Sequence, residues 1–447
     1  MSNLEETKKD YTMKSLLTYA APTILAMIFV SVYTMVDGIF LARFVDSTAL
    51  AAVNIFMPIY ALIFAIALML GTGGSAIIAK KMGENNPREA QRDFTNIVVF
   101  GALLGLIIMI LGLVFIRPIL EVLGAGTSSL LFDYTFTYGQ IILWTSPFLI
   151  IQGMFEALFV TAGKPKLSLL ITIIGGSTNI ALDYLFIVVM NMGVKGAALA
   201  TSIGIVIPSI LGIIYFLTSS KSLLYFTKFK FKWGLILESS INGSSEMVTN
   251  LSSSVVTFAF NFLMLKFIGV EGVAAVTIML YAMFILTPLF MGYSVGIAPI
   301  ISYNYGRQNV DKLKKIFKNS LVFITISSIS IFVLSHLLGP YLIRFMAVQG
   351  SDVYEIAKNG FWFFSLSFLF MGINIFTSML FTALSNGKIS AIISILRTLV
   401  FVLTALLVLP PLIGINGIWI ATPLAELLSV VVCTFFLFRN RKVYQYF

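Results

Sequence analysis

The chain has 447 residues, of which 59% are hydrophobic and only 11% are charged. A soluble domain carries about twice that charged fraction, so the composition excludes a soluble globular protein and indicates a chain embedded in lipid. The net charge of +10 would suggest a nucleic-acid surface in a soluble protein, but in a membrane protein the basic residues report topology, and we expect no nucleic-acid partner.

Residues 1–14 are polar, and the apolar run that follows them is long enough to cross a membrane, so we expect a cytoplasmic N-terminal segment rather than a cleaved signal. A membrane span takes about 20 helical residues. Runs of this length recur to residue 438 and predict an all-α polytopic membrane protein with twelve transmembrane helices in two pseudo-symmetric six-helix lobes. The predicted helices cover residues 15–42, 49–80, 94–117, 131–162, 166–191, 195–219, 235–268, 272–303, 316–347, 356–385, 389–412 and 415–438.

The first six predicted helices form an N-lobe of residues 15–219, and the last six form a C-lobe of residues 235–438. Residues 220–234 are expected to be a cytoplasmic linker between the lobes, and residues 439–447 a cytoplasmic tail. Prolines inside the predicted spans should kink them, because proline lacks the N–H donor of the helix ladder. These prolines are Pro22, Pro58, Pro147, Pro208, Pro288, Pro299 and Pro423.

Charged side chains inside a span are functional candidates, because an ionisable group in the hydrocarbon costs at least ~2.5 kcal/mol. Asp37 of the first helix, Asp183 of the fifth and Thr201 of the sixth lie at similar depth when counted at about 1.5 Å per residue. Asn179 precedes Asp183 by four residues and therefore shares its helix face. We expect these four side chains to converge inside the N-lobe; the alternative is a hydrogen-bonded polar knot that only fixes helix packing.

Three further acids lie in predicted spans. Glu156, near the inner end of the fourth helix, is a candidate gate residue, a cation-attracting wall or an ion-pair partner of Lys164. Glu246 has polar neighbours, Asn250 among them, that suggest a hydrated cavity, and Glu426 lies in the last helix. We name Glu156, Glu246, Asn250 and Glu426 as candidates for a substrate site or a second cation site.

Basic residues divide unequally between the two sides of the predicted membrane. With a cytoplasmic N-terminus, 23 of the 29 basic residues fall on the inner side and 6 on the outer side. This asymmetry follows the positive-inside rule and predicts that both termini are cytoplasmic. We therefore expect a multi-pass protein of the plasma membrane.

The two halves resemble each other at nearly constant spacing, which is the mark of a duplicated transporter. Because each half has an even number of helices, both halves should enter the membrane from the same side. Ala51, Ala52, Val53, Gly83, Asn86, Phe94 and Asn96 recur 223 residues later as Ala274, Ala275, Val276, Gly306, Asn309, Phe317 and Asn319. Thr161, Ala162, Gly193, Gly196, Ala200 and Thr201 recur 221 residues later as Thr382, Ala383, Gly414, Gly417, Ala421 and Thr422.

Six segments, in this order and spacing, resemble the multidrug and toxic compound extrusion (MATE) family on its DinF-like or MepA-like side, and the resemblance covers essentially the whole chain. They are VDGIF at 36–40, AIIAKKMGENNPREAQR at 76–92, VTAGKPKLSLL at 160–170, NIALDYLFI at 179–187, GVKGAALATSIG at 193–204 and APIISYNYGRQN at 298–309.

The resemblance implies roles for particular residues. Asp37, Asn179, Asp183 and Thr201 match the family's first-lobe cation site. Glu246 matches an acid of the seventh helix that some members use for a second-lobe sodium site. Where those members place an acid in the tenth helix, this chain has Asn374, so we expect the second-lobe site to be incomplete.

The resemblance also implies a secondary active transporter and not an enzyme: a cation-coupled antiporter that exports amphipathic organic cations by alternating access. We expect a monomer in the lipid bilayer, without cofactor, coupled to H⁺ or Na⁺. We favour the proton, because two adjacent carboxylates share one proton, while Na⁺ at Asp37, Asn179, Asp183 and Thr201 is the alternative metal ion.

The runner-up function is a lipid or lipid-linked oligosaccharide flippase of the same superfamily. Such a protein needs basic residues in its cavity to bind a pyrophosphate, and Arg397 is the one inward-facing candidate. A membrane enzyme would need an acid-rich metal motif or a nucleophile with its base, and the sequence offers neither.

Overall fold

The computed structural model describes residues 11–219 and 222–447, so residues 1–10 of the predicted N-terminal segment and residues 220–221 of the predicted linker lie outside the described residues. The described part of the chain is helical and contains no strand. Residues 11–219, the N-terminal half, form α2 (Met13–Phe44), α3 (Ser47–Gly83), α4 (Pro87–Val114), α5 (Ile116–Val122), η1 (Ala125–Thr127), α6 (Ser129–Trp144), α7 (Ser146–Thr161), α8 (Pro165–Asp183), η2 (Tyr184–Val189) and α9 (Gly193–Thr218). Residues 222–447, the C-terminal half, form α10 (Trp233–Phe267), α11 (Val270–Leu286), α12 (Pro288–Gly306), α13 (Val310–Met346), α14 (Asp352–Ser365), α15 (Ser367–Ala383), α16 (Gly387–Ile395), η3 (Leu396–Val400), α17 (Phe401–Ile413) and α18 (Ile415–Tyr444).

Among the described residues, ten continuous helical stretches are long and apolar enough to cross a membrane. Two more candidate spans are helix pairs that are bent at a short break: α6 with α7, by 60°, and α14 with α15, by 47°. Counting each bent pair as one span gives twelve. The predicted all-α polytopic fold is confirmed.

The two bends have the same local cause. At the first, the hydroxyls of Thr145 and Ser146 each donate to a backbone carbonyl three residues earlier, at 2.8 Å. At the second, the hydroxyls of Ser365 and Ser367 do the same at 2.9 and 2.7 Å. A side chain that bonds back to its own helix competes with the helix ladder and bends it. Pro147 follows the first bend, whereas the second bend occurs without a proline.

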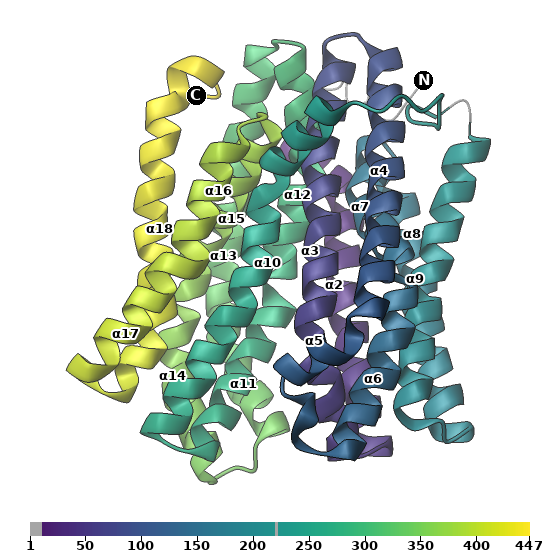
Figure 1. Cartoon of the computed structure of the whole chain (residues 1–447). Helices are drawn as coiled ribbons and strands as arrows, with labels where there is room; N and C mark the ends of the chain where they lie inside the picture. The colour runs from purple at the N-terminus through teal and green to yellow at the C-terminus, as the bar shows by residue number, and fades with distance from the viewer. Residues whose placement is uncertain (1–10, 220–221) are drawn as a thin grey trace.

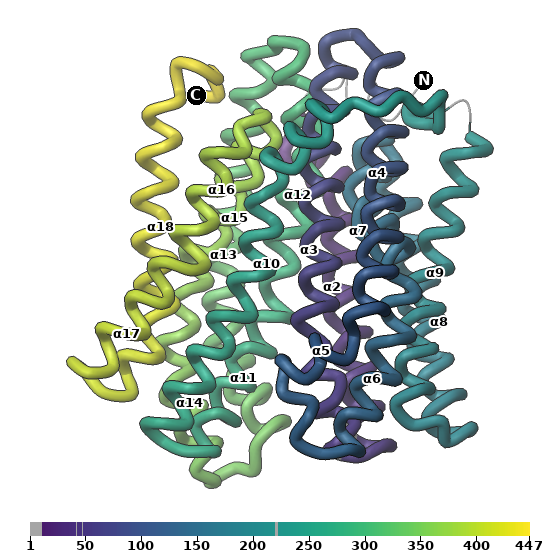
Figure 2. Tube along the Cα trace, in the orientation of Figure 1, coloured from purple at the N-terminus to yellow at the C-terminus, as the bar shows by residue number. Residues whose placement is uncertain are grey.

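The helices of the two halves lie on opposite sides of the bundle (Figure 1). The beginning of α2, the end of α18 and the segment that joins the halves lie at one end of the bundle, which we call the terminal face (Figure 1). Between the halves, α3 packs against α10 and α12, and α2 packs against α12. Figure 2 shows α3 beside α10 where the halves meet.

Backbone-to-backbone contacts close the halves against each other toward the terminal face. A Cβ atom on Gly243 of α10 would lie 1.9 Å from the Met69 carbonyl oxygen of α3. At the end of α3, a Cβ on Gly83 would lie 2.1 Å from the Tyr303 carbonyl oxygen of α12, and a Cβ on Gly306 would lie 2.1 Å from that of Lys80. A side chain at any of these glycines would force the helices apart.

A charged network ties the joining segment to the N-terminal half at the terminal face. Asp93 of α4 has a fully buried side chain and accepts from Lys81 of α3 and from Lys232, the residue before α10, which lies 3.3 Å away. Glu89 lies 3.0 Å from Lys81 and 3.3 Å from Lys232. Two lysines and two acids therefore neutralise one another where three segments meet.

Candidate cation site

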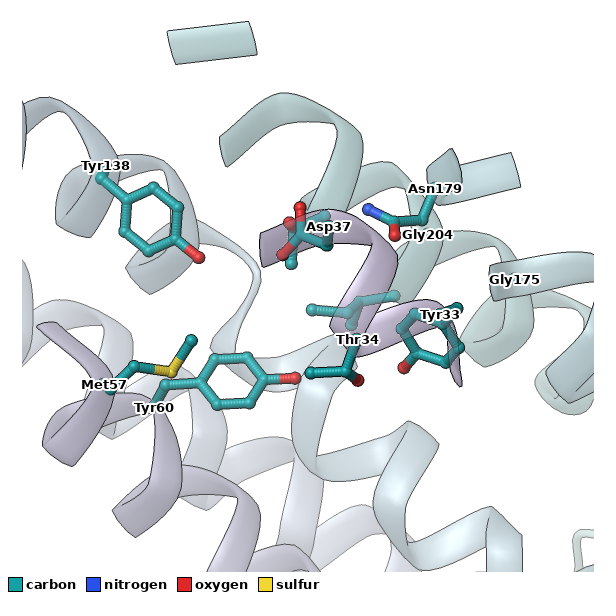
Figure 3. A pocket seen from close by; sticks show the side chains of 11 residues that line it. Tyr33, Thr34, Asp37, Met57, Tyr60, Tyr138, Gly175, Asn179 and Gly204 are labelled. Carbon is teal, nitrogen blue, oxygen red and sulfur yellow. The ribbon is translucent and has the colours of Figure 1, made fainter. Parts of the chain in front are cut away.

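A cavity of about 130 Å³ lies among α2, α3, α6, α8 and α9 of the N-terminal half (Figure 3). Figure 3 shows Asp37 between Tyr138 on one side and Asn179 on the other. None of the described residues that line it is basic, and Asp37 is its one acid. The lining residues are Tyr33, Thr34, Asp37, Met57, Tyr60, Tyr138, Gly175, Asn179, Thr201, Gly204 and Ile205.

Close packing of α8 on α2 brings the acid-bearing helices together. A Cβ atom on Gly176 of α8 would lie 2.6 Å from the ring of Phe29 and 2.7 Å from the ring of Tyr33, both on α2. The glycine thus allows the two aromatic rings to lie directly on the α8 backbone. Asp183, two turns further along α8, then reaches Asp37.

Asp37 and Asp183 form a carboxyl pair. Their side chains lie within hydrogen-bonding reach of each other. Asp183 is fully buried, and neither of its oxygens has a hydrogen-bond donor among the described residues; the same holds for Oδ1 of Asp37. Asp183 is the last residue of α8, directly before the π-helical turn η2. Such π turns are frequent at functional sites.

Two neutral oxygens complete the group. Oδ1 of Asn179 and Oγ1 of Thr201 are buried and have no donor within the described part of the chain. Buried polar atoms are nearly always satisfied, so a cluster of orphaned oxygens indicates a missing proton or cation. Carboxylate, amide and hydroxyl oxygens are the ligands that hard cations prefer. The structure therefore brings together the four side chains that the sequence predicted to converge, and their chemistry fits Na⁺ or a shared proton.

Glu156 lies outside this cavity. It lines a smaller one together with Gln152 and Pro208, and it forms no ion pair with Lys164 in the described structure. Tyr33 and Tyr60 lie within electrostatic reach of both Glu156 and Asp37. These two tyrosines therefore lie near both acids.

The acids of the C-terminal half are arranged differently. Arg397 Nε donates to both carboxylate oxygens of Glu426, at 2.9 and 3.0 Å. Glu246 is buried, and its carboxylate has no hydrogen bond to a described residue. Asn250 donates to the backbone carbonyl of Glu246 at 2.9 Å, so its amide is used within its own helix.

Sequence reasoning treated Arg397 and Glu426 separately and missed their contact. The signal was present: opposite charges buried in predicted spans must find partners. Arg397 was the residue that favoured a pyrophosphate-binding flippase. Because Glu426 compensates its charge, Arg397 is not a free cation.

An all-α bundle of membrane spans with an acidic, oxygen-lined cavity defines a membrane transport protein. The family model described as MatE matches residues 22–185 and 247–407. The chain therefore belongs to the MatE family, the multidrug and toxic compound extrusion family that its sequence motifs predicted, and it is a transporter rather than an enzyme.

Relatives and solved structures agree with this assignment. The chain is 24% identical over 442 residues to the multidrug export protein MepA of Staphylococcus saprophyticus, covering 94% of this chain and 92% of the relative. It is 24% identical over 457 residues to MepA of Staphylococcus aureus, covering 97% and 96%. A multidrug resistance MATE family transporter of the MOP superfamily, solved in an outward-facing conformation, has a TM-score of 0.90 at 21% identity, with 97% of each chain covered. A MATE crystal structure in the bent conformation has a TM-score of 0.89 at 20% identity, with 100% and 98% covered.

Proposed function

We propose that the chain is a cation-coupled antiporter that exports amphipathic organic cations, with Asp37 and Asp183 binding the coupling ion. The observation that carries the proposal is the Asp37–Asp183 pair, in which Asp183 is fully buried and Asp37 faces a cavity that no basic residue lines. Two acids in contact need a proton or a cation between them, so the site is built to exchange one. The multidrug export names of the relatives support export as the direction.

The cavity has the size of a binding site for the coupling ion rather than for the drug. Its volume of about 130 Å³ is below the roughly 300 Å³ of the smallest drug pockets. A water molecule takes about 30 Å³, so the cavity suits an ion with a few waters. Tyr33, Tyr60 and Tyr138 offer aromatic faces beside Asp37, which favours a positively charged substrate at the cavity mouth through cation–π attraction.

We favour the proton as the coupling ion. A protonated carboxyl of one aspartate donates to the carboxylate of the other, which satisfies the contact that the structure shows. Protonation then removes the negative charge that holds an organic cation. Sodium is the alternative, bound by the carboxylates with the Asn179 and Thr201 oxygens.

The contacts between the halves support alternating access. The glycine contacts of α3 with α10 and α12 close the terminal face, and they must separate for a substrate to enter from that side. We place this face in the cytoplasm of a plasma-membrane protein, because most basic residues lie there. The ion site is complete within one chain, so a monomer suffices.

The driving force of one ion per cycle is adequate for a substrate that carries no net charge. One elementary charge that crosses about 150 mV supplies ~3.5 kcal/mol, at about 2.3 kcal/mol per 100 mV. Export of such a substrate against a roughly hundredfold gradient costs ~2.7 kcal/mol, as 1.4 kcal/mol corresponds to a factor of ten. Exchange of a monovalent organic cation for one proton moves no net charge, so the pH gradient drives it, at about 1.4 kcal/mol per pH unit.

The purified protein in proteoliposomes tests the proposal. In the absence of sodium, a pH gradient that moves protons opposite to the dye should drive transport of ethidium. A sodium gradient in the same direction, at matched pH and with the membrane potential clamped, should not drive it. Export driven only by sodium would overturn the proton assignment and leave the four-residue site standing. Ethidium flux that responds to neither gradient, at a rate equal to that of Asp183→Asn, would overturn the antiporter.

A further inference from the structure

The C-terminal half contains a buried ion pair in the middle of its helices. Arg397 and Glu426 are 8% and 5% exposed. Besides the two hydrogen bonds from Arg397, the Glu426 carboxylate accepts one from Asn374 Nδ2 at 2.6 Å. Such a pair is weak evidence for stability, because apolar residues of the same volume often serve as well. Its presence in a membrane span therefore points to a function.

Further oxygens surround the pair. The Glu246 carboxylate is buried and lies within electrostatic reach of Arg397. Oδ1 of Asn374 and Oγ1 of Thr377 are buried without a donor among the described residues, and both side chains are fully buried. The group near the pair thus comprises two carboxylates, the Asn374 amide and, one turn further along α15, the Thr377 hydroxyl. These are the ligand types found at Asp37, Asp183, Asn179 and Thr201.

The two groups also have related positions in the fold. Asp183 lies directly before the π-helical η2, and Arg397 lies within the π-helical η3, each on the fifth span of its half. By the 221-residue spacing, Arg397 and Glu426 correspond to Gly176 and Ile205 of the N-terminal half. Gly176 has no side chain and Ile205 lines the cavity. The pair therefore stands where the other half has a close contact of Gly176 with α2 and the cavity-lining Ile205.

We propose that the guanidinium of Arg397 is the resident cation of a second cation site, formed by Glu246, Glu426, Asn374 and Thr377. In this site, Asn374 stands where an acid would complete a sodium site, and the tethered charge of Arg397 takes the place of a free ion. If Arg397 occupies the second site, each transport cycle exchanges one ion, in the N-terminal half alone. This consequence rests on the proposed function. The identity of the cation in the second site does not rest on the proposed function, and it can be tested without a transport measurement.

Removing the tethered cation should turn the site into one that takes a free cation. Arg397→Gln leaves Glu426 buried and uncompensated, so sodium or protons should bind there. Arg397→Lys keeps a tethered cation and is the matched control. Arg397→Gln combined with Glu426→Gln removes both charges.

The measurement is the midpoint temperature of unfolding of each purified full-length protein, in NaCl and in choline chloride at equal ionic strength, and at pH 7.5 and 5.5. Binding of a cation to the folded protein raises this midpoint temperature. For Arg397→Gln we expect sodium or acid to raise it by about 3 °C or more beyond the rise seen for the unmutated protein. Arg397→Lys and the double variant should show no such extra rise.

An Arg397→Gln protein that responds to sodium and acid no more than the unmutated protein would overturn the proposal, and so would an equal extra response in the double variant. If Arg397→Gln folds in neither sodium nor acid while the double variant folds, the proposal is also wrong, because the freed site must accept these ions.

Discussion

Asp183 of α8 faces Asp37 of α2, and neither carboxylate oxygen of Asp183 meets a donor in the described structure. Replacing either aspartate by asparagine keeps the shape of the side chain and removes one charge. We expect Asp37→Asn and Asp183→Asn each to abolish coupled export while expression and folding persist. Cellular dye efflux together with thermal unfolding of the purified variants checks this. Full drug resistance in cells carrying either variant would contradict the assignment of Asp37 and Asp183 to the coupling site.

Organic cations and protons should compete at this site. Lowering the pH protonates the pair and removes the negative charge that attracts the substrate, so the apparent affinity for tetraphenylphosphonium should fall as the pH falls, by about fivefold or more. Binding to Asp37→Asn should be weaker and nearly independent of pH. Equilibrium binding from pH 8 to 5.5 measures both, and an equal pH dependence in the variant contradicts competition at Asp37.

Glu246→Gln should be milder than Asp37→Asn. In the C-terminal half Asn374 stands where an acid would complete a sodium site, and the charge of Arg397 is already used by Glu426. We expect partial loss of efflux with the coupling ion unchanged. A loss as complete as that of Asp37→Asn would show that our emphasis on the N-terminal half is wrong.

Gly243→Ala should loosen the closure of the two halves. The new methyl group would lie 1.9 Å from the Met69 carbonyl oxygen, and backbone cannot move as cheaply as a side chain. We expect destabilisation of about 1–3 kcal/mol and faster hydrogen exchange at the ends of α3 and α10 near the terminal face. Gly234→Ala in the same helix is the control, because no atom lies within 4 Å of its added Cβ. Equal exchange in the two variants contradicts the role of this contact.

Asp93→Asn should destabilise the protein more than Glu89→Gln. Asp93 is fully buried between Lys81 and Lys232, whereas Glu89 is 39% exposed. Because both lysines are partly exposed, we expect a loss of about 1–3 kcal/mol for Asp93→Asn, below the full cost of breaking a buried pair, and under about 1 kcal/mol for Glu89→Gln. Chemical denaturation in detergent compares the two, and equal losses would show that water already screens Asp93.

The sequence was most informative where geometry is local. Hydrophobic run length predicted twelve spans, because the bilayer sets that length. Counting depth along α2, α8 and α9 predicted that Asp37, Asp183 and Thr201 would meet, because the rise per residue is fixed. Their role as the coupling site stays a prediction.

Helix ends were predicted less well. Hydropathy placed the start of the third span at residue 94 and the end of the last at residue 438, but α4 begins at Pro87 and α18 runs to Tyr444. These additional turns are polar and charged, so they are helical without being apolar. Proline positions likewise gave no warning of the bend at Ser365 and Ser367, which results from side-chain hydrogen bonds.

Contacts between distant segments left no local pattern. Arg397 and Glu426 lie 29 residues apart on successive spans, and Lys232 approaches Asp93 across 139 residues. The basic residues of the joining segment were interpreted as topology signals, and the sequence did not show that one of them would be partly buried against an acid.

The glycine contacts at the terminal face are reciprocal. Gly83 meets the carbonyl of Tyr303, and Gly306 meets that of Lys80. The two glycines are 223 residues apart, and so are Lys80 and Tyr303. The halves therefore meet there as the two subunits of an isologous dimer do, each presenting the same patch to the other. In such an arrangement, parting one contact parts its mate, so we expect this seam to open as a unit.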